Sequence, residues 1–272
     1  RGMNDSAEFA EGILTLAVAN ILKDSLEKQG ATVFVTRKAP GYTSFNKTLE
    51  QWIKSDFVTL MEQKVKAGQM TAKRKKWWLT KASPENIYNA YFKDLELKNR
   101  ADIINAFQPN FTIIIHFNVD ETNSPWNKPG TKNFNMVFVG GALYKNDMNT
   151  ADKRFEFLRL LVSNDIDESI KLSNNTVKMF KEFLNVPAAN QKDAKYLREN
   201  CLITDCDGVF CRDLFLTHFV HGPLVFGETL YQDNIQECKM LNEESDKTKN
   251  KRIRQVANAY YYGILNYVRQ GI

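Results

Sequence analysis

The run Phe111-Thr-Ile-Ile-Ile-His116 is the most apolar strand-like segment of the chain, and it constrains the fold more than any other feature. It follows a helical pattern that begins at Ser83-Pro84-Glu85, with an N-cap serine and proline at the first helical position, and closes before Pro109. Earlier in the chain, the helix expected over 11–28 leads into the apolar run 31–37, and a helix between apolar runs is typical of βαβ units, in which parallel strands are buried. The sequence therefore predicts an α/β architecture.

Further helices and strands are expected on both sides of this unit. Apolar spacing predicts helices over 11–28, 151–185 and 247–268. Short apolar runs predict strands over 31–37, 135–139 and 224–228. In the 151–185 segment, the residues expected to form a buried stripe are Phe155, Leu158, Leu161, Ile170, Val177 and Phe180. The sequence has no internal repeat and no low-complexity linker, so we expect one domain over residues 1–272.

The composition excludes several classes of protein. The chain has 272 residues, of which 43% are apolar and 25% are charged, the ordinary balance of a globular chain with a sizeable core. A disordered or collagen-like chain is therefore excluded. No stretch approaches the roughly 18 uncharged apolar residues of a membrane helix, so we expect no membrane span. The net charge of +5 permits an anionic partner without requiring one.

An insertion over about residues 45–80 interrupts the connection between the expected strand 31–37 and the helix that starts at Ser83. It is mostly polar, has helical spacing, and ends in Lys73-Arg-Lys-Lys-Trp77-Trp78. Such a basic run with two tryptophans can bind nucleic acid, membrane head groups or glycan. The interpretation we favour is a solvated helix whose tryptophans pack onto the body of the protein.

The four cysteines, Cys201, Cys206, Cys211 and Cys238, leave two interpretations open. Structural zinc sites usually join two pairs of ligands, and the first three cysteines have no fourth partner nearby, which disfavours a metal. A disulfide, for example between Cys201 and Cys211, is plausible in an exported protein. Free buried thiols are equally compatible with the sequence.

Three side chains stand out by their positions. His116 and Glu228 each end an expected strand, and Glu11 begins the first expected helix. Ligands of open α/β sheets bind at the carboxyl ends of the strands. One imidazole and two carboxylates at that edge would suit a catalytic zinc ion, which takes nitrogen and oxygen ligands. Spacing alone leaves the alternative open, because a histidine at a strand end is more often a satisfied polar residue, and a glutamate at a helix start favours the helix dipole.

Four blocks of sequence together resemble one enzyme family. They are Glu11-Gly-Ile-Leu-Thr-Leu-Ala-Val-Ala19 with Val35-Thr-Arg37, then Arg100 to Asn105 leading to Ile114-Ile-His116-Phe-Asn118, then Pro223 to Asn234, and Ala257 to Tyr267. In content and order they are similar to the zinc-dependent N-acetylmuramoyl-L-alanine amidases of bacterial cell-wall turnover.

The resemblance implies a three-layer α/β fold, with a twisted, mostly parallel sheet of about six strands and helices on both faces. It implies Zn²⁺ as cofactor, with Glu11 and His116 as two ligands and Glu228 as the catalytic glutamate. The expected reaction is hydrolysis of the amide between N-acetylmuramic acid and L-alanine in peptidoglycan or muropeptides. It further implies a periplasmic or secreted location and an activator protein that could act on the 45–80 insertion. A nucleic-acid partner is not expected, because the basic run Lys73–Trp78 that would bind it is one short stretch of the chain.

The chain also departs from the family pattern. The family's first ligand is a histidine in a His-Gly-Gly turn after the first strand, which we expect upstream of Arg1. His218 and His221 match no ligand position, and we interpret them as structural or substrate-lining. Leu230 replaces a glycine and could narrow the cleft or tilt the loop, whereas Gly227 would permit close backbone approach. The alternative function is a metal-free relative that binds cell-wall glycopeptide or a partner protein without cleavage.

Overall fold

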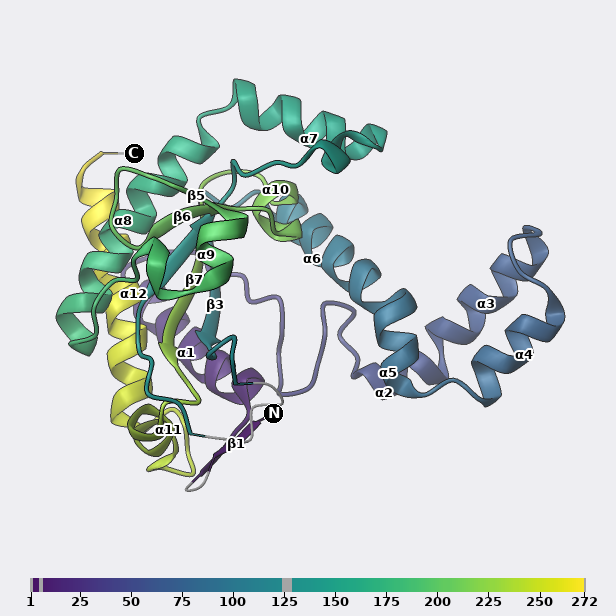
Figure 1. Ribbon diagram of the computed structural model, residues 1–272, viewed down its shortest axis with the longest axis horizontal. Helices are drawn as coiled ribbons and strands as arrows, with labels where there is room; N and C mark the ends of the chain where they lie inside the picture. The colour runs from purple at the N-terminus through teal and green to yellow at the C-terminus, as the bar shows by residue number, and fades with distance from the viewer. Residues whose placement is uncertain (1, 5–6, 124–128, 272) are drawn as a thin grey trace. The chain divides into compact units, whose positions relative to one another are not determined.

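The structure is a computed structural model that describes residues 2–4, 7–123 and 129–271. The chain divides into two compact units (Figure 1). The first, the sheet unit, consists of residues 1–35 and 108–272, and the second, the helical unit, consists of residues 36–107. No helix of the described residues is long and apolar enough to cross a membrane.

A five-stranded mixed sheet is the centre of the sheet unit, in the order β3-β7-β4-β6-β5. The β3–β7 and β4–β6 pairs are parallel, whereas the β4–β7 and β5–β6 pairs are antiparallel. Its strands are β3 (Thr112–Asn118), β4 (Met136–Val139), β5 (Cys201–Ile203), β6 (Val209–Arg212) and β7 (Leu224–Tyr231). A separate antiparallel pair, β1 (Gly2–Asn4) and β2 (Ala7–Phe9), precedes the first helix.

Helices cover the two faces of this sheet unequally. One face packs against α1 (Glu11–Glu27), α8 (Asp165–Leu184) and α12 (Lys251–Arg269), and Figure 1 shows α8 and α12 side by side. Their apolar stripes meet alternate strand residues such as Val137 and Val225 in the main core. The other face carries a smaller core around Met136 and Phe138, which Leu197 of α9 (Lys195–Asn200) helps to cover. The remaining helices of the sheet unit are α7 (Ala151–Val162), α10 (Phe215–Phe219), α11 (Ile235–Asn242) and the 3₁₀ turns Lys145–Met148 and Gln191–Asp193.

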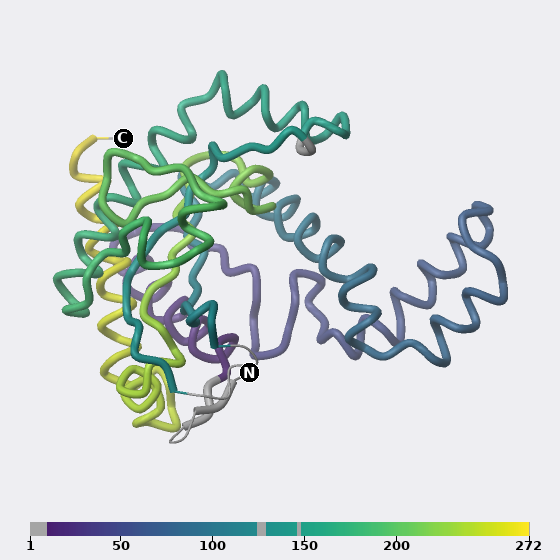
Figure 2. Tube along the Cα trace, in the orientation of Figure 1, coloured from purple at the N-terminus to yellow at the C-terminus, as the bar shows by residue number. Residues whose placement is uncertain are grey.

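The helical unit has its own aromatic core. Trp52, Phe57, Trp78 and Phe92 are buried in it, and the ring centroids of Trp52 and Phe92 are 4.9 Å apart. Figure 2 shows α3 and α4 as neighbouring segments of this unit. Its helices are α2 (Leu49–Lys54), α3 (Asp56–Lys66), α4 (Ala72–Thr80), α5 (Pro84–Ile87) and α6 (Lys93–Phe107), with a π-turn over Tyr88–Phe92.

Most of the expected elements are confirmed. Helices over 11–28, 83–107 and 247–268 correspond to α1, to α5 with α6, and to α12. Ser83 caps its helix as expected, since its hydroxyl accepts the Asn86 N–H at 3.2 Å. The expected strands over 111–116, 135–139 and 224–228 correspond to β3, β4 and β7. The insertion expected over 45–80 is helical and lies within the helical unit.

The strand expected over 31–37 is wrong. This segment has no regular structure, and all its residues are exposed or half-buried. β-propensity produces a strand only where the backbone N–H and C=O groups find a neighbouring strand, and no described residue pairs with this segment. The sheet consequently has five strands within the described residues, where about six were expected. The α/β class itself is confirmed.

The buried stripe expected in 151–185 is half wrong. The α8 part is right, because Val177 and Phe180 are buried. On α7, in contrast, Phe155, Leu158 and Leu161 are 62%, 58% and 63% exposed. The buried positions of α7 are instead Glu156 and Leu160. Helical spacing reveals an apolar stripe, but it cannot show whether another element covers that stripe.

The structure also answers the questions that the sequence left open about the two tryptophans of the basic run and the four cysteines. Trp78 is buried in the aromatic core, whereas Trp77 is 40% exposed and lies under the Arg74 guanidinium. All four cysteines are free thiols. Cys211 pairs with Leu202, the residue after Cys201, so Cys201 and Cys211 point to opposite faces of the sheet and a disulfide between them is excluded.

Candidate active site

Glu11 and His116 meet at the start of α1. Glu11 is the first residue of α1, and His116 is near the carboxyl end of β3. Glu11 Oε1 lies 2.8 Å from His116 Nδ1 and accepts the Phe117 backbone N–H at 3.2 Å. Both side chains remain accessible, with 33% of Glu11 and 43% of His116 exposed. The two side chains predicted to share a site therefore converge on one solvent-accessible point.

Glu228 lies on the same face of the sheet as His116. The two residues are direct partners in the parallel β3–β7 register, so their side chains project on the same side. Phe226, two residues earlier on β7, stacks its ring against the His116 imidazole at 4.8 Å and an angle of 6°. This contact holds the imidazole in one orientation beside the glutamate.

The two glutamates have opposite electrostatic environments. Burial raises the pKa of Glu228 to about 7, and the nearby Glu11 charge adds to the rise, while His116 and Arg212 oppose it. For Glu11, burial also favours the neutral form, but the hydrogen bond and charge of His116, the Phe117 N–H and the Gln232 side chain outweigh it and lower the pKa. Glu11 is therefore held as a carboxylate, and Glu228 exchanges a proton near neutral pH.

A β-bulge immediately follows Glu228. The register between β3 and β7 shifts after Phe117, which leaves Leu230 as the extra residue, with φ of 55°. Such bulges favour glycine in the left-handed conformation, and glycine is the residue that the family resemblance led us to expect here. Leu230 is fully buried in the main core, so its side chain does not narrow a cleft. Asn135 holds this turn, since its Oδ1 accepts the Leu230 N–H at 3.2 Å and the Thr229 hydroxyl at 2.6 Å.

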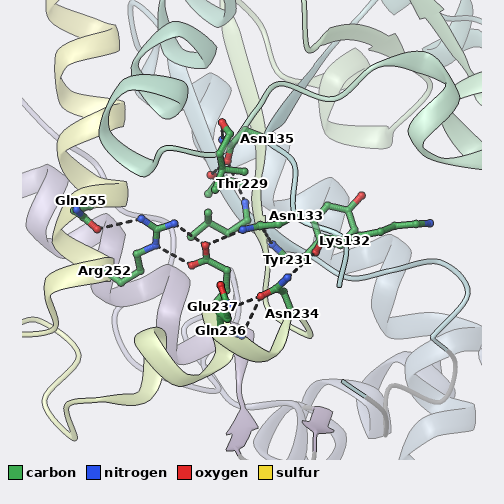
Figure 3. A network of polar contacts seen from close by, with 12 residues as sticks. Lys132, Asn133, Asn135, Thr229, Tyr231, Asn234, Gln236, Glu237, Arg252 and Gln255 are labelled. Atoms are coloured by element: carbon green, nitrogen blue, oxygen red, sulfur yellow. Dashed lines mark hydrogen bonds and ion pairs between the residues drawn. The ribbon is translucent and has the colours of Figure 1, made fainter. Parts of the chain in front are cut away.

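A buried polar network fixes the chain beyond the bulge (Figure 3). Arg252 of α12 makes two hydrogen bonds to Glu237 of α11, at 2.8 and 2.6 Å. Asn133 joins the network to β7, because its side chain donates to Glu237 at 2.8 Å and accepts the Tyr231 N–H at 3.0 Å. The end of β7 is thus tied to two helices and to the segment that precedes β4.

Other motif residues have structural roles. Asn234 caps α11 by accepting the N–H groups of Gln236 and Glu237. Gly227 confirms the expected close approach, since a Cβ there would lie 2.1 Å from the Tyr260 hydroxyl oxygen. Arg100 binds Thr36 and Glu96 inside the helical unit.

The other two histidines do not join this group. His218 is buried in α10, with Nδ1 3.3 Å from Asp213, and it lines a cavity of about 180 Å³. His221 lies before the first residue of β7, where its Nε2 is 3.3 Å from Glu156. Both therefore contact carboxylates at the opposite end of β7 from the bulge.

Two residues near the site were not anticipated. Arg212 ends β6 and lies over the rings of Phe138 and Tyr196. The hydroxyl of Tyr196 accepts a hydrogen bond from Asn118 at 3.1 Å. Neither residue belongs to a motif, and the only signal is the short apolar run Val209-Phe-Cys211, which is compatible with a strand that ends at Arg212.

The described residues supply part of a metal site. Glu11 and His116 place an oxygen and a nitrogen atom 2.8 Å apart, and both are ligand types that zinc accepts. No cluster of three or more His, Cys, Asp or Glu residues suitable for a metal ion occurs among the residues that the structure describes. The pair therefore fits as two ligands of a zinc ion.

Comparison with protein-family models decides the family. A model described as N-acetylmuramoyl-L-alanine amidase matches residues 1–266. The chain belongs to this amidase family. The match includes Glu11, His116 and Glu228, as well as the whole helical unit. Among curated protein sequences, none matches this chain.

Solved structures of amidases share the fold. The CwlD amidase from Clostridioides difficile, solved in complex with the GerS lipoprotein, has a TM-score of 0.56 and 17% identity, covering 99% of this chain and 91% of its own. The amidase Ami1 from Mycobacterium abscessus has a TM-score of 0.52 and 14% identity, with 98% and 82% covered. Ami1 from Mycobacterium smegmatis has a TM-score of 0.54 and 12% identity, with 99% and 82% covered. These similarities support the α/β fold.

Proposed function

We propose that this protein hydrolyses the amide bond between the lactyl group of N-acetylmuramic acid and L-alanine in peptidoglycan. The observation that carries the proposal is the 2.8 Å contact between Glu11 and His116 on the sheet face that Glu228 shares. Membership of the amidase family supports the same reaction. The site combines a carboxylate, an imidazole and a second carboxyl group with a pKa near neutrality.

Glu11 and His116 would hold a zinc ion as two of its protein ligands. A zinc ion bound there would lower the pKa of water and polarise the scissile carbonyl. Catalytic zinc sites usually have three protein ligands, so a further ligand has to complete the set. The Phe226 ring keeps His116 oriented, and the Phe117 N–H keeps Glu11 oriented.

Glu228 would act as general base and then as general acid. It takes a proton from the attacking water as the new C–O bond forms at the lactyl carbonyl. It then delivers that proton to the alanine nitrogen as the C–N bond breaks, which leaves an acid and an amine. A pKa of about 7 suits both steps, because a proton shuttle works best near the operating pH.

A non-catalytic relative is the second candidate. It is motivated by the donor set, because Glu11 and His116 are the two proposed ligands and the described residues hold no cluster of three or more candidate metal ligands. Such a protein would bind cell-wall glycopeptide or a partner protein at the same sheet face. The complex of the CwlD amidase with a lipoprotein is a precedent for a protein partner. For our chain, we propose a periplasmic or secreted location and an activator protein acting on the insertion at 45–80.

Mass spectrometry of a digested muropeptide tests the proposal. The protein, supplied with zinc, is incubated with a soluble disaccharide-peptide, and we expect a free peptide that starts with L-alanine and a disaccharide that ends in a lactyl carboxylate. The Glu228→Gln variant should give neither product. Intact substrate with the unmodified protein, or cleavage at another bond, would contradict the proposal. Retained binding without cleavage would favour the second candidate.

A further inference from the structure

Arg212 lies in an environment that differs from those of Arg100, Arg159 and Arg252. It is the last residue of β6, and its guanidinium carbon is 4.7 Å from the ring centroids of both Phe138 and Tyr196. Phe138 is fully buried, so it is a fixed surface for the guanidinium. Stacking on aromatic rings leaves the N–H groups at the edge of the guanidinium plane available for hydrogen bonds.

Among the described residues, no carboxylate forms an ion pair with Arg212, and no residue accepts a hydrogen bond from its guanidinium. The comparison with other arginines is direct. Arg159 binds Glu156 and Asp165, Arg252 binds Glu237, and Arg100 binds Glu96. Because arginine stays charged, a half-buried guanidinium without an acidic partner is suited to an anion from outside the chain.

The position of Arg212 connects it to the candidate active site. In the sheet register Glu228 is opposite Met136, Phe226 is opposite Phe138, and Phe138 is opposite Phe210. Arg212 is two residues after Phe210 and therefore projects from the same face as Glu228. Its positive charge is close enough to lower the pKa of Glu228.

A row of rings links the two groups. The imidazole of His116 stacks on Phe226, whose centroid is 6.4 Å from that of Phe138, and Phe138 lies beneath Arg212. Strands β7 and β6 are separated by β4, which corresponds to about 10 Å across the sheet. Buried rings thus connect the candidate site residues on β3 and β7 with the cation at the end of β6.

We propose that Arg212 binds a carboxylate of the substrate's peptide arm and thereby sets which amide reaches Glu228. The proposal rests on the proposed amidase function. An extended peptide advances about 3.5 Å per residue, so a carboxylate on one of the first few residues beyond the scissile amide would reach the guanidinium. A planar guanidinium can bind both oxygens of that carboxylate at once, which gives specificity as well as affinity.

The experiment compares two muropeptides that differ only in the free carboxylates of the peptide arm, which are amidated in one of them. For Arg212→Gln, kcat/KM on the carboxylate substrate should fall by about 10–100-fold, mostly through KM, because a charge-assisted bidentate contact is lost. On the amidated substrate the change should stay below about threefold. Arg212→Lys keeps the positive charge but loses the planar guanidinium. Its kcat/KM on the carboxylate substrate should therefore lie between those of the unmodified protein and Arg212→Gln.

Arg254→Gln is the matched control, because it removes one positive charge from an exposed position on α12. It should leave both substrates unaffected. Equal loss on both substrates in Arg212→Gln would assign the residue a structural role and overturn the proposal, as would no loss on either. Amidating one carboxylate at a time then identifies the group that Arg212 binds.

Failure of the proposed function is a separate outcome. If the unmodified protein cleaves neither substrate, equilibrium binding of the same two muropeptides tests Arg212 directly. Preference for the carboxylate form that disappears in Arg212→Gln would support the site. Equal binding of both forms by the unmodified protein would overturn it.

Discussion

The two units of this chain differ in both charge and core. The helical unit, residues 36–107, has 14 basic and 7 acidic residues, a net charge of +7, whereas the whole chain carries +5 and the sheet unit therefore carries −2. The sheet unit has an aliphatic core between strands and helices, while the helical unit is built around tryptophan and phenylalanine rings. All three histidines belong to the sheet unit.

The residues proposed for hydrolysis and the excess of basic residues therefore lie in different units. The residues suited to hydrolysis, Glu11, His116 and Glu228, all lie in the unit with the small negative net charge. The basic residues of the other unit, such as Lys73 and Lys76, are exposed on a helix whose tryptophans contact the unit's own core or the Arg74 side chain. This arrangement fits the solvated helix favoured from the sequence. We therefore expect substitutions in the two units to have separable effects.

The largest expected effect comes from Glu228→Gln in the sheet unit. Loss of the proton shuttle should lower kcat by about 10³-fold or more, with the metal content unchanged. Glu85→Gln, at an exposed carboxylate of the helical unit, is the control and should leave kcat unchanged. The measurement is turnover of a soluble muropeptide. Similar losses of kcat in both variants would contradict the expectation that substitutions in the two units have separable effects.

Removal of a proposed metal ligand should have the next largest effect. Loss of a residue that only hydrogen-bonds to a metal ligand typically weakens metal binding by roughly 10–100-fold. His116→Ala removes a proposed ligand itself, so it should weaken zinc binding by more than that. His221→Ala is the control, since His221 contacts Glu156 and lies away from Glu11. Zinc content after dialysis, measured by atomic emission, distinguishes them. Full zinc content in His116→Ala would remove this residue from the ligand set.

Phe57→Ala tests whether the units are stable independently. Phe57 is fully buried in the aromatic core, so its truncation should destabilise the helical unit by about 3–5 kcal/mol. Hydrogen exchange should then show loss of protection in α2 to α4 but not in α8 or α12. Trp77→Ala, at a 40% exposed ring, should have a much smaller effect. Loss of protection in α8 as well would show that the two units unfold together.

The smallest expected effect is a difference in pH dependence. The pKa of Glu228 is raised to about 7, so its contribution to stability is present below about pH 4.5 and is lost as pH rises through 7. In the helical unit, Lys54 lowers the pKa of Glu50 and Lys47 lowers that of Asp56, so their contributions are lost only in more acidic solution. Without metal, the sheet unit should lose on the order of 1–2 kcal/mol between pH 5 and 7.5.

Urea unfolding at several pH values, followed by hydrogen exchange in each unit, measures this difference. Glu228→Gln should reduce the pH dependence of the sheet unit, because the amide does not titrate. The helical unit should show little change over the same interval in both proteins. An unchanged slope in the variant would assign the dependence to other groups.

The sequence predicted those elements in which the spacing of the apolar residues matches the residues that are buried. The apolar spacing of α8 and α12 and the apolar runs of β3 and β7 identify their elements, since each is covered by neighbours. The same reasoning failed for α7, where Phe155 remains exposed, and for 31–37, which lacks a pairing strand. Both failures depend on which elements lie beside a segment in space, and the local sequence pattern does not give this information.

The candidate site was partly predictable for the same reason. Glu11, His116 and Glu228 were identified by their places at element ends and by family resemblance, and the structure brings them together. Arg212 and Tyr196 could not be identified, because the short hairpin of β5 and β6 and the helix α9 carry weak signals. Their relation to Glu228 depends on a strand order that runs β7-β4-β6 in space and not in sequence.

The central claim is that the sheet unit delivers water to one particular amide, and isotope labelling tests it most directly. A muropeptide is digested in H₂¹⁸O, and the products are sequenced by tandem mass spectrometry. We expect one ¹⁸O atom in the new lactyl carboxylate, an unlabelled L-alanine amine terminus, and no label in the Glu228→Gln reaction. Label in a sugar ring or at another peptide bond, or no label with the unmodified protein, would contradict the account.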